Sequence, residues 1–84
     1  MIKLKKEILK YERIRNLRID SGLTQKKVAD MLKIKQNTYS QYEIGVLHYH
    51  LDIVIRLANF YGTSVDYLVG LTDNPNPYER ASIK

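Results

Sequence analysis

The stretch Leu23–Gly45, LTQKKVADMLKIKQNTYSQYEIG, decides the fold of this chain. Thr24 is a good helix N-cap, and the apolar positions after it predict a helix over about 25–33. A second helix is predicted over about 36–44, and Gly45 is suited to end it in the left-handed conformation. The two short helices therefore meet at a tight turn.

The second of these helices divides its side chains between the inside and the outside of the domain. Tyr39 and Tyr42 are expected to point inward. The residues expected to point outward are Gln36, Asn37, Ser40 and Gln41. Because amide side chains can hydrogen-bond the edges of bases, this division predicts a helix-turn-helix module that reads DNA in the major groove.

Three further helices are predicted around this pair. The first covers about 6–20 and is followed by a Ser-Gly stop. The most regular one covers about 51–61, and its apolar stripe consists of Leu51, Val54, Leu57, Ala58 and Tyr61. A short helix over 65–69 completes the set. The expected fold is all-α, a compact domain of five helices whose core also takes up most of the tyrosines.

The chain has room for a single domain. Eighty-four residues are enough for one core but too few for two. We expect residues 1–10 to be a basic N-terminal extension of the first helix and residues 11–71 to be the helix-turn-helix domain. Residues 72–84 are expected to be a flexible tail, because the Asn-Pro-Asn-Pro sequence at 74–77 cannot continue a helix.

The positive charge is concentrated in the first part of the chain. Residues 1–35 carry eleven Lys or Arg against four acidic residues, whereas residues 36–84 carry three against five. A protein with this asymmetry can present a basic face to phosphates. A simpler interpretation remains for Lys3, Lys5, Lys6 and Lys10, which could merely solvate the N-terminal helix.

Composition excludes several classes of function. Without cysteine there are no disulfides, thiolate metal sites or cysteine nucleophiles. No apolar run approaches the roughly 18 residues that span a bilayer, and the N-terminus is too charged for a secretory signal. His48 and His50 alone make a poor metal site. No catalytic triad, glycine-rich phosphate loop or paired carboxylates are present, so we expect no enzyme, no metal and no cofactor. The composition favours a cytoplasmic prokaryotic protein.

Four motifs carry a resemblance to a known family, in the order RIRNLR, GLTQKKVADML, QNTYSQYEIG and LDIVIRLANFYGTSVDYLVG. Together they resemble the Xre-type, or Cro/phage-repressor-like, helix-turn-helix domains over roughly residues 13–73. The resemblance implies a lambda-repressor-like fold in which the helix at 25–33 crosses the DNA backbone and the helix at 36–44 lies in the groove. It also implies a transcriptional regulator that usually binds inverted repeats as a dimer.

The same resemblance implies roles for individual residues in binding double-stranded DNA. Gln25 looks like the family glutamine that holds a phosphate near a helix N-terminus. Gln36 and Asn37 are placed to bond adenine edges, and Lys35 to reach a guanine or a phosphate. The full set of expected DNA-binding residues is Gln25, Lys26, Lys35, Gln36, Asn37, Thr38, Ser40 and Gln41.

Arg18 and Glu43 look like the internal ion pair of the family, which ties the first helix to the end of the third.

The chain also departs from the family pattern. Lys33 stands in the turn where glycine is frequent, and a left-handed lysine costs roughly 1 kcal/mol. Ile44 replaces an asparagine, and His50 replaces a serine cap. The loop over 46–50 is therefore a weak source of DNA contacts.

Several apolar residues lie outside the expected core, and they do not decide whether the chain binds a second copy of itself or another protein. They are Val46, Leu47, Tyr49, Ile53, Ile55 and Phe60. They are either scattered surface residues or a dimer face that leaves the reading helix free. The leading hypothesis is a homodimeric repressor on an inverted-repeat operator. The alternative is an antitoxin or adaptor that uses the same fold mainly to bind another protein. Membrane-surface attachment through residues 2–11 is a third, weaker interpretation.

Overall fold

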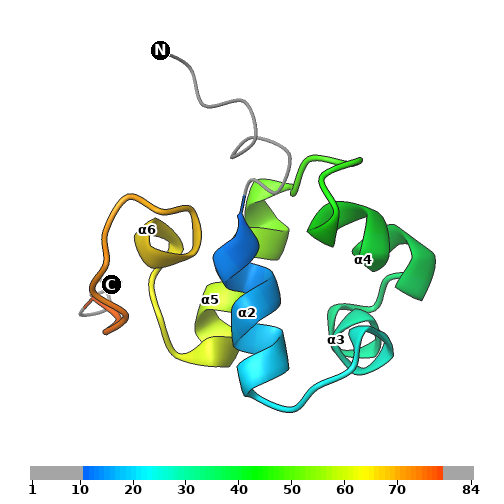
Figure 1. The fold of residues 1–84 in the computed structure, drawn as a ribbon, viewed down its shortest axis with the longest axis horizontal. Coiled ribbons are helices and arrows are strands. Elements are labelled where there is room, and N and C mark those ends of the chain that lie inside the picture. Colours follow the sequence, from blue (N-terminus) through cyan, green and yellow to red (C-terminus); the bar gives the residue numbers. More distant parts are fainter. Residues whose placement is uncertain (1–10, 79–84) are drawn as a thin grey trace, which may run out of the picture.

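The computed structural model describes residues 11–78. This part of the chain contains five helices and no strand: α2 (Glu12–Asp20), α3 (Gln25–Leu32), α4 (Gln36–Glu43), α5 (Leu51–Tyr61) and α6 (Val65–Leu68). In Figure 1, α2 and α5 occupy the middle of the view, with α3 and α4 to one side and α6 to the other. The all-α prediction is confirmed. The basic extension at 1–10 falls on residues outside the described part, as does all of the segment 2–11 in the membrane-surface hypothesis except Tyr11.

The pairing of α3 with α4 is set by their caps and by the turn between them. The Thr24 hydroxyl accepts the Lys27 backbone N–H at 3.0 Å and caps α3. Lys33 ends α3 in the left-handed conformation, with φ of 62°, and it alone among the described non-glycine residues has a positive φ. The Ile34 N–H then closes the turn on the Ala29 carbonyl at 3.0 Å. The left-handed lysine predicted from the sequence is thus present, at a cost of roughly 1 kcal/mol.

The core lies where the five helices meet, with α3 packed on α4, α5 on α6, and α2 against both α4 and α6. Its buried apolar residues are Ile14, Val28, Ala29, Leu32, Tyr39, Tyr42, Ile53, Val54, Leu57, Ala58 and Leu68. Tyr11, Tyr61 and Tyr67 pack against this core from its edge. The prediction that the tyrosines serve the core is therefore confirmed for these positions.

The apolar stripe of α5 differs from the predicted one at two residues. Leu51 was expected to be inside, but it is 68% exposed, whereas Ile53 was expected outside and is 5% exposed. Helical side chains lean toward the N-terminus, so Leu51 in the first turn leans past the end of the helix instead of over the core. Ile53 lies one turn before Leu57 and shares its buried face. None of the helices in residues 11–78 is long and apolar enough to cross a membrane.

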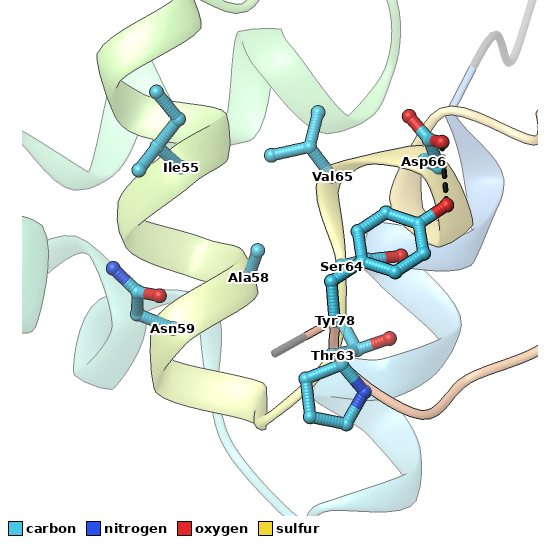
Figure 2. A pocket seen from close by; sticks show the side chains of 9 residues that line it. Ile55, Ala58, Asn59, Thr63, Ser64, Val65, Asp66 and Tyr78 are labelled. Atoms are coloured by element: carbon cyan, nitrogen blue, oxygen red, sulfur yellow. Dashed lines mark hydrogen bonds between the residues drawn. The ribbon is translucent and has the colours of Figure 1, made fainter. Parts of the chain in front are cut away.

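The segment 72–78 is not helical, but side chains from the domain hold it. Thr63 Oγ1 donates to the Pro75 carbonyl at 2.6 Å, and the Tyr78 hydroxyl donates to Asp66 Oδ2 at 2.7 Å. Figure 2 shows the cavity of about 360 Å³ between α5 and this segment, with Ile55 on one wall and Tyr78 on the other. The prediction of a flexible tail over 72–84 did not include these contacts, and residues 79–84 lie outside the described part.

Candidate nucleic-acid interface

The outward face of α4 is polar along its whole length. Gln36 and Asn37 are exposed, as is Lys35 just before the helix. Thr38, Ser40 and Gln41 are half-buried. The inward residues Tyr39 and Tyr42 are buried, which confirms the inner side of the predicted division, whereas Ser40 and Gln41 are less exposed than predicted. The result is a short helix with a fixed inner face and an outer face rich in hydrogen-bonding groups.

The N-terminus of α3 presents a second polar surface beside a shallow cavity of about 280 Å³. Lys26 and Lys27 line it, and the free N–H groups of the helix end add partial positive charge. The Lys26 ammonium lies 3.2 Å from the carboxylate of Asp30, and both side chains are largely exposed. Lys27 has no ion pair within residues 11–78. It was not among the predicted DNA-binding residues, although the basic first half of the sequence contains it.

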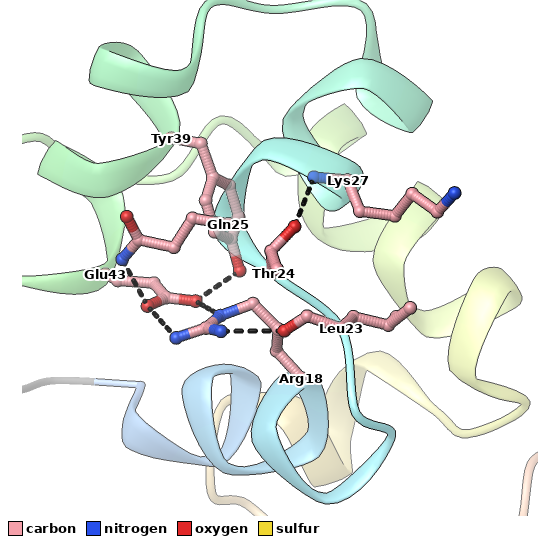
Figure 3. Close-up of polar contacts among 7 residues, drawn as sticks. All are labelled: Arg18, Leu23, Thr24, Gln25, Lys27, Tyr39 and Glu43. Carbon is pink, nitrogen blue, oxygen red and sulfur yellow. Dashed lines mark hydrogen bonds and ion pairs between the residues drawn. The ribbon is translucent and has the colours of Figure 1, made fainter.

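Beneath these two surfaces, the Glu43 carboxylate accepts hydrogen bonds from three helices (Figure 3). Arg18 on α2 donates from Nε to Oε2 at 2.7 Å and from Nη2 to Oε1 at 3.2 Å. Tyr39 donates its hydroxyl to Oε2 at 2.6 Å, and Gln25 donates from Nε2 to Oε1 at 3.0 Å. Arg18 also donates from Nη1 to the Leu23 carbonyl at 2.8 Å. The ion pair expected between Arg18 and Glu43 is thus the centre of a larger cluster.

Electrostatics fix the protonation state of this cluster. Burial by itself would raise the pKa of Glu43, but the hydrogen bonds from Arg18, Tyr39 and Gln25 outweigh it and lower the pKa below its usual value. The hydrogen bond to Glu43 raises the pKa of Arg18 against the effect of burial. Burial raises the pKa of Tyr39 well above its ordinary value, and the bond to Glu43 raises it further. At neutral pH the carboxylate is therefore ionised and the phenol is its donor.

Gln25 lies where the buried cluster meets the surface of α3. Its side chain is half-buried, and its amide nitrogen is bonded to Glu43. An amide nitrogen carries two hydrogens, so one remains for another acceptor. The contact with Glu43 is thus compatible with the phosphate role that the resemblance implies for Gln25.

The loop after α4 is apolar and aromatic instead of basic. Val46, Leu47 and His48 are exposed, and the ring of Tyr49 stacks on Tyr42 with 4.9 Å between their centroids. His50 stands at the N-cap of α5 without a side-chain capping bond. Within residues 11–78 no group of three or more metal-ligating residues comes together.

Two helices joined by a tight left-handed turn, the second with a polar outer face, define a helix-turn-helix protein. The helix-turn-helix family model matches residues 14–68, more than half of the chain. The chain therefore belongs to the helix-turn-helix family. The resemblance to Xre-type domains found in the sequence is confirmed, and the family module is a DNA-binding one without enzymatic activity, as expected.

Several curated bacterial and phage proteins are similar to this chain. The uncharacterized HTH-type transcriptional regulator YobD of Bacillus subtilis (strain 168) is 39% identical over 74 residues, covering 87% of this chain and 66% of that protein. The cryptic phage CTXphi transcriptional repressor RstR of Vibrio cholerae is 40% identical over 57 residues, covering 68% and 51%. The HTH-type transcriptional regulator ImmR of Bacillus subtilis (strain 168) is 37% identical over 59 residues, covering 70% and 46%. The chain thus spans about half to two thirds of the length of these relatives. No solved structure matches it.

Proposed function

We propose that this chain is a sequence-specific, double-stranded-DNA-binding transcriptional regulator that inserts α4 into the major groove. The observation that carries the proposal is the division of α4 into a buried face, locked by Tyr39 and Glu43, and an outer face of amides and hydroxyls. A helix held in this way can present its side chains to base edges without first becoming ordered. The names of the relatives, regulators and a repressor, support the same function.

The polar residues of this surface divide by chemistry into base-reading and phosphate-holding groups. We assign base reading to Gln36 and Asn37, because each amide can bond adenine N6 and N7, with discrimination of about 1–3 kcal/mol for a good pair. Gln41 lies one turn further along α4 and extends this row. The residues assigned mainly to phosphates are Gln25, Lys26, Lys35, Thr38 and Ser40.

We propose a homodimer, because two copies of α4 must enter successive major grooves about 34–36 Å apart to read an inverted repeat. The surface we assign to the dimer consists of the exposed side chains of Leu51, Ile55 and Tyr78, at α5 and the segment 72–78. Leu51 and Ile55 are four residues apart and so share one face of α5. Ile53 is buried and cannot belong to this surface.

Sedimentation of an Ile55→Glu variant tests the dimer. We expect the variant to be monomeric at concentrations at which the parent chain is a dimer, because the carboxylate would be buried in the interface. Ile19→Glu is the matched control, since Ile19 is similarly exposed on α2, outside this surface. Equal dissociation of both variants, or of neither, would contradict the assigned surface.

A second candidate function is an antitoxin or adaptor that binds a protein partner. The observation that favours it is the exposed apolar group Ile44, Val46 and Leu47 directly after α4, where a DNA contact would require polar side chains. A stoichiometric partner that co-purifies from native extract, and that is lost on Val46→Glu but not on Gln36→Ala, would support this candidate.

The decisive experiment is selection from a random double-stranded DNA pool at about 150 mM salt, a concentration that suppresses non-specific binding. We expect enrichment of an inverted repeat with half-sites about one helical turn apart. Gln36→Ala should then weaken binding to that repeat far more than to random DNA, whereas Asn16→Ala, an exposed amide on α2, should change neither. Equal losses on both DNAs would exclude base reading by Gln36.

A further inference from the structure

The Glu43 carboxylate has no unused acceptor position. A carboxylate accepts about four hydrogen bonds, and here Oε2 accepts from Tyr39 and Arg18 Nε while Oε1 accepts from Arg18 Nη2 and Gln25. The donors come from α2, α3 and α4, so one buried group links α2 to both helices of the helix-turn-helix. Such a group has one satisfied orientation, because rotating it breaks bonds on both oxygens.

Tyr39 is the donor to this carboxylate that comes from α4 itself. It lies one turn before Glu43 on α4, its side chain is fully buried, and its bond of 2.6 Å is the shortest of the four. Because the phenol holds Oε2 from within α4, the other oxygen is turned toward α3, where it meets the Gln25 amide. Figure 3 shows this sequence of contacts from Tyr39 through Glu43 to Gln25.

We propose that Tyr39 is a positioning residue for DNA recognition, which acts through Glu43 to fix the side chain of Gln25 at the start of α3 relative to α4. This inference rests on the proposed function. Tyr39 contacts no DNA, since its side chain is completely covered. Its effect is to present the second N–H of the Gln25 amide in one direction before DNA arrives. An amide that is already held loses less side-chain freedom on binding a phosphate.

The hydroxyl of another buried tyrosine, Tyr49 or Tyr61, could replace that of Tyr39 as a hydrogen-bond donor to Glu43. Both hydroxyls are buried and have no hydrogen-bond partner within residues 11–78, and burial raises the pKa values of both tyrosines, with a further rise from the charge of Glu43. If the Tyr39 hydroxyl is removed, Tyr49 is a candidate to replace it. The test therefore includes Tyr39→Phe alone and Tyr39→Phe with Tyr49→Phe.

The first test needs no DNA. The side-chain amide protons of Gln25 are followed by NMR in the free protein, in the parent chain and in the Tyr39→Phe/Tyr49→Phe variant. We expect two well-resolved, slowly exchanging resonances in the parent chain and averaged, faster-exchanging ones in the variant. Tyr42→Phe is the matched control, because Tyr42 is buried on the same helix and its hydroxyl is not part of the Glu43 cluster. Unchanged Gln25 resonances in the folded double variant would overturn the proposal, whatever the DNA results.

The second test uses the operator found by selection. We expect Tyr39→Phe/Tyr49→Phe to lower operator affinity by about threefold to tenfold, the range expected when one ordered side chain becomes free, and Tyr42→Phe to leave it unchanged. The same pair of substitutions in a Gln25→Ala background should have little further effect, because the residue they position is gone. A full additional loss in that background would overturn the proposal. If the double variant does not fold, Glu43→Gln is used instead, because its neutral amide accepts through one oxygen only. The Gln25 amide resonances must then become averaged and faster-exchanging, or the proposal fails.

Discussion

Two arginines on α2, five residues apart, form ion pairs of different kinds. Arg18 pairs with Glu43 beneath α3 and α4, and only 12% of the arginine side chain and 1% of the carboxylate side chain are exposed. Arg13 pairs with Asp73 at the other side of the domain, with 28% and 96% exposed. The same residue type on the same helix thus forms a buried ion pair in one place and an ion pair with an exposed carboxylate in the other.

The difference shows that burial of the carboxylate, more than the presence of an ion pair, decides what each arginine contributes. Glu43 cannot regain water if Arg18 is lost, whereas Asp73 is already hydrated. Most of the contacts of Arg13 are with uncharged groups. Its Nη1 donates to the Tyr67 and Thr72 carbonyls, and its guanidinium lies 4.3 Å from the centroid of the Tyr67 ring. The four predictions below test this difference.

Arg18→Ala should have the largest effect. It leaves Glu43 ionised and buried with only Tyr39 and Gln25 as donors, a change that costs about 3–5 kcal/mol in buried pairs. We expect the free energy of unfolding, measured by urea titration and circular dichroism, to fall by that amount, enough to unfold a marginal domain. Arg15→Ala, an exposed arginine on the same helix, is the control. A loss below 1 kcal/mol would mean that Glu43 is stabilised without its cation.

Acid should weaken the same cluster. Because the folded state lowers the pKa of Glu43 below its ordinary value, the stabilisation is complete at pH values above that ordinary value and is lost as pH falls through the lowered one. The free energy of unfolding, followed from pH 7 to pH 3, should therefore fall more steeply in the parent chain than in Glu43→Gln. Asp73→Asn, which removes an exposed carboxylate, is the control. Parallel pH curves for the parent chain and Glu43→Gln would contradict the lowered pKa.

Patterns that act over a few residues predicted most of the fold. The capping residue Thr24 and the 3.6-residue periodicity placed α3 and α5 correctly, since both signals are local. The error at Leu51 and Ile53 arises where local periodicity is not enough. Periodicity shows that α5 has an apolar side, but two adjacent faces of the helix share the stripe, and only the neighbouring helices decide which face is covered.

The contacts that the sequence did not reveal join residues far apart in the chain. Arg13 meets Asp73 across 60 positions, and Gln25 meets Glu43 across 18. Neither contact leaves a local pattern, because each depends on how α2 or α3 packs against a part of the chain that is distant in sequence. This is why the segment 72–78 was predicted only as a tail, and why Gln25 was assigned to a phosphate without its internal partner. The DNA roles of the exposed residues on α4 stay predictions.

Arg13→Ala should have an intermediate effect. Two hydrogen bonds to carbonyl groups and the contact with the Tyr67 ring would be lost, but no charge would be stranded inside the domain. We expect a loss of about 1–2 kcal/mol in the free energy of unfolding, from roughly 1 kcal/mol for a hydrogen bond and less for a partly exposed cation–π contact. Arg13→Lys should recover only part of it, because an ammonium cannot reproduce the guanidinium fork. A loss as large as that of Arg18→Ala would remove the distinction between the two regions.

Asp73→Ala should have the smallest effect. It removes the ion pair with Arg13 but keeps the contacts of Arg13 with Tyr67 and Thr72. The carboxylate side chain is 96% exposed, and exposed ion pairs contribute about 0–1 kcal/mol. Arg13 keeps its bonds to Tyr67 and Thr72 in this variant, so the segment 72–78 should remain docked on α6. Urea titration at low and high salt measures the loss, which should shrink further as salt screens the pair. The loss of unfolding free energy could instead equal that of Arg13→Ala and be the same at low and high salt. That result would show that Asp73 acts by shaping the backbone after Thr72, and the charge on Arg13 would then be incidental.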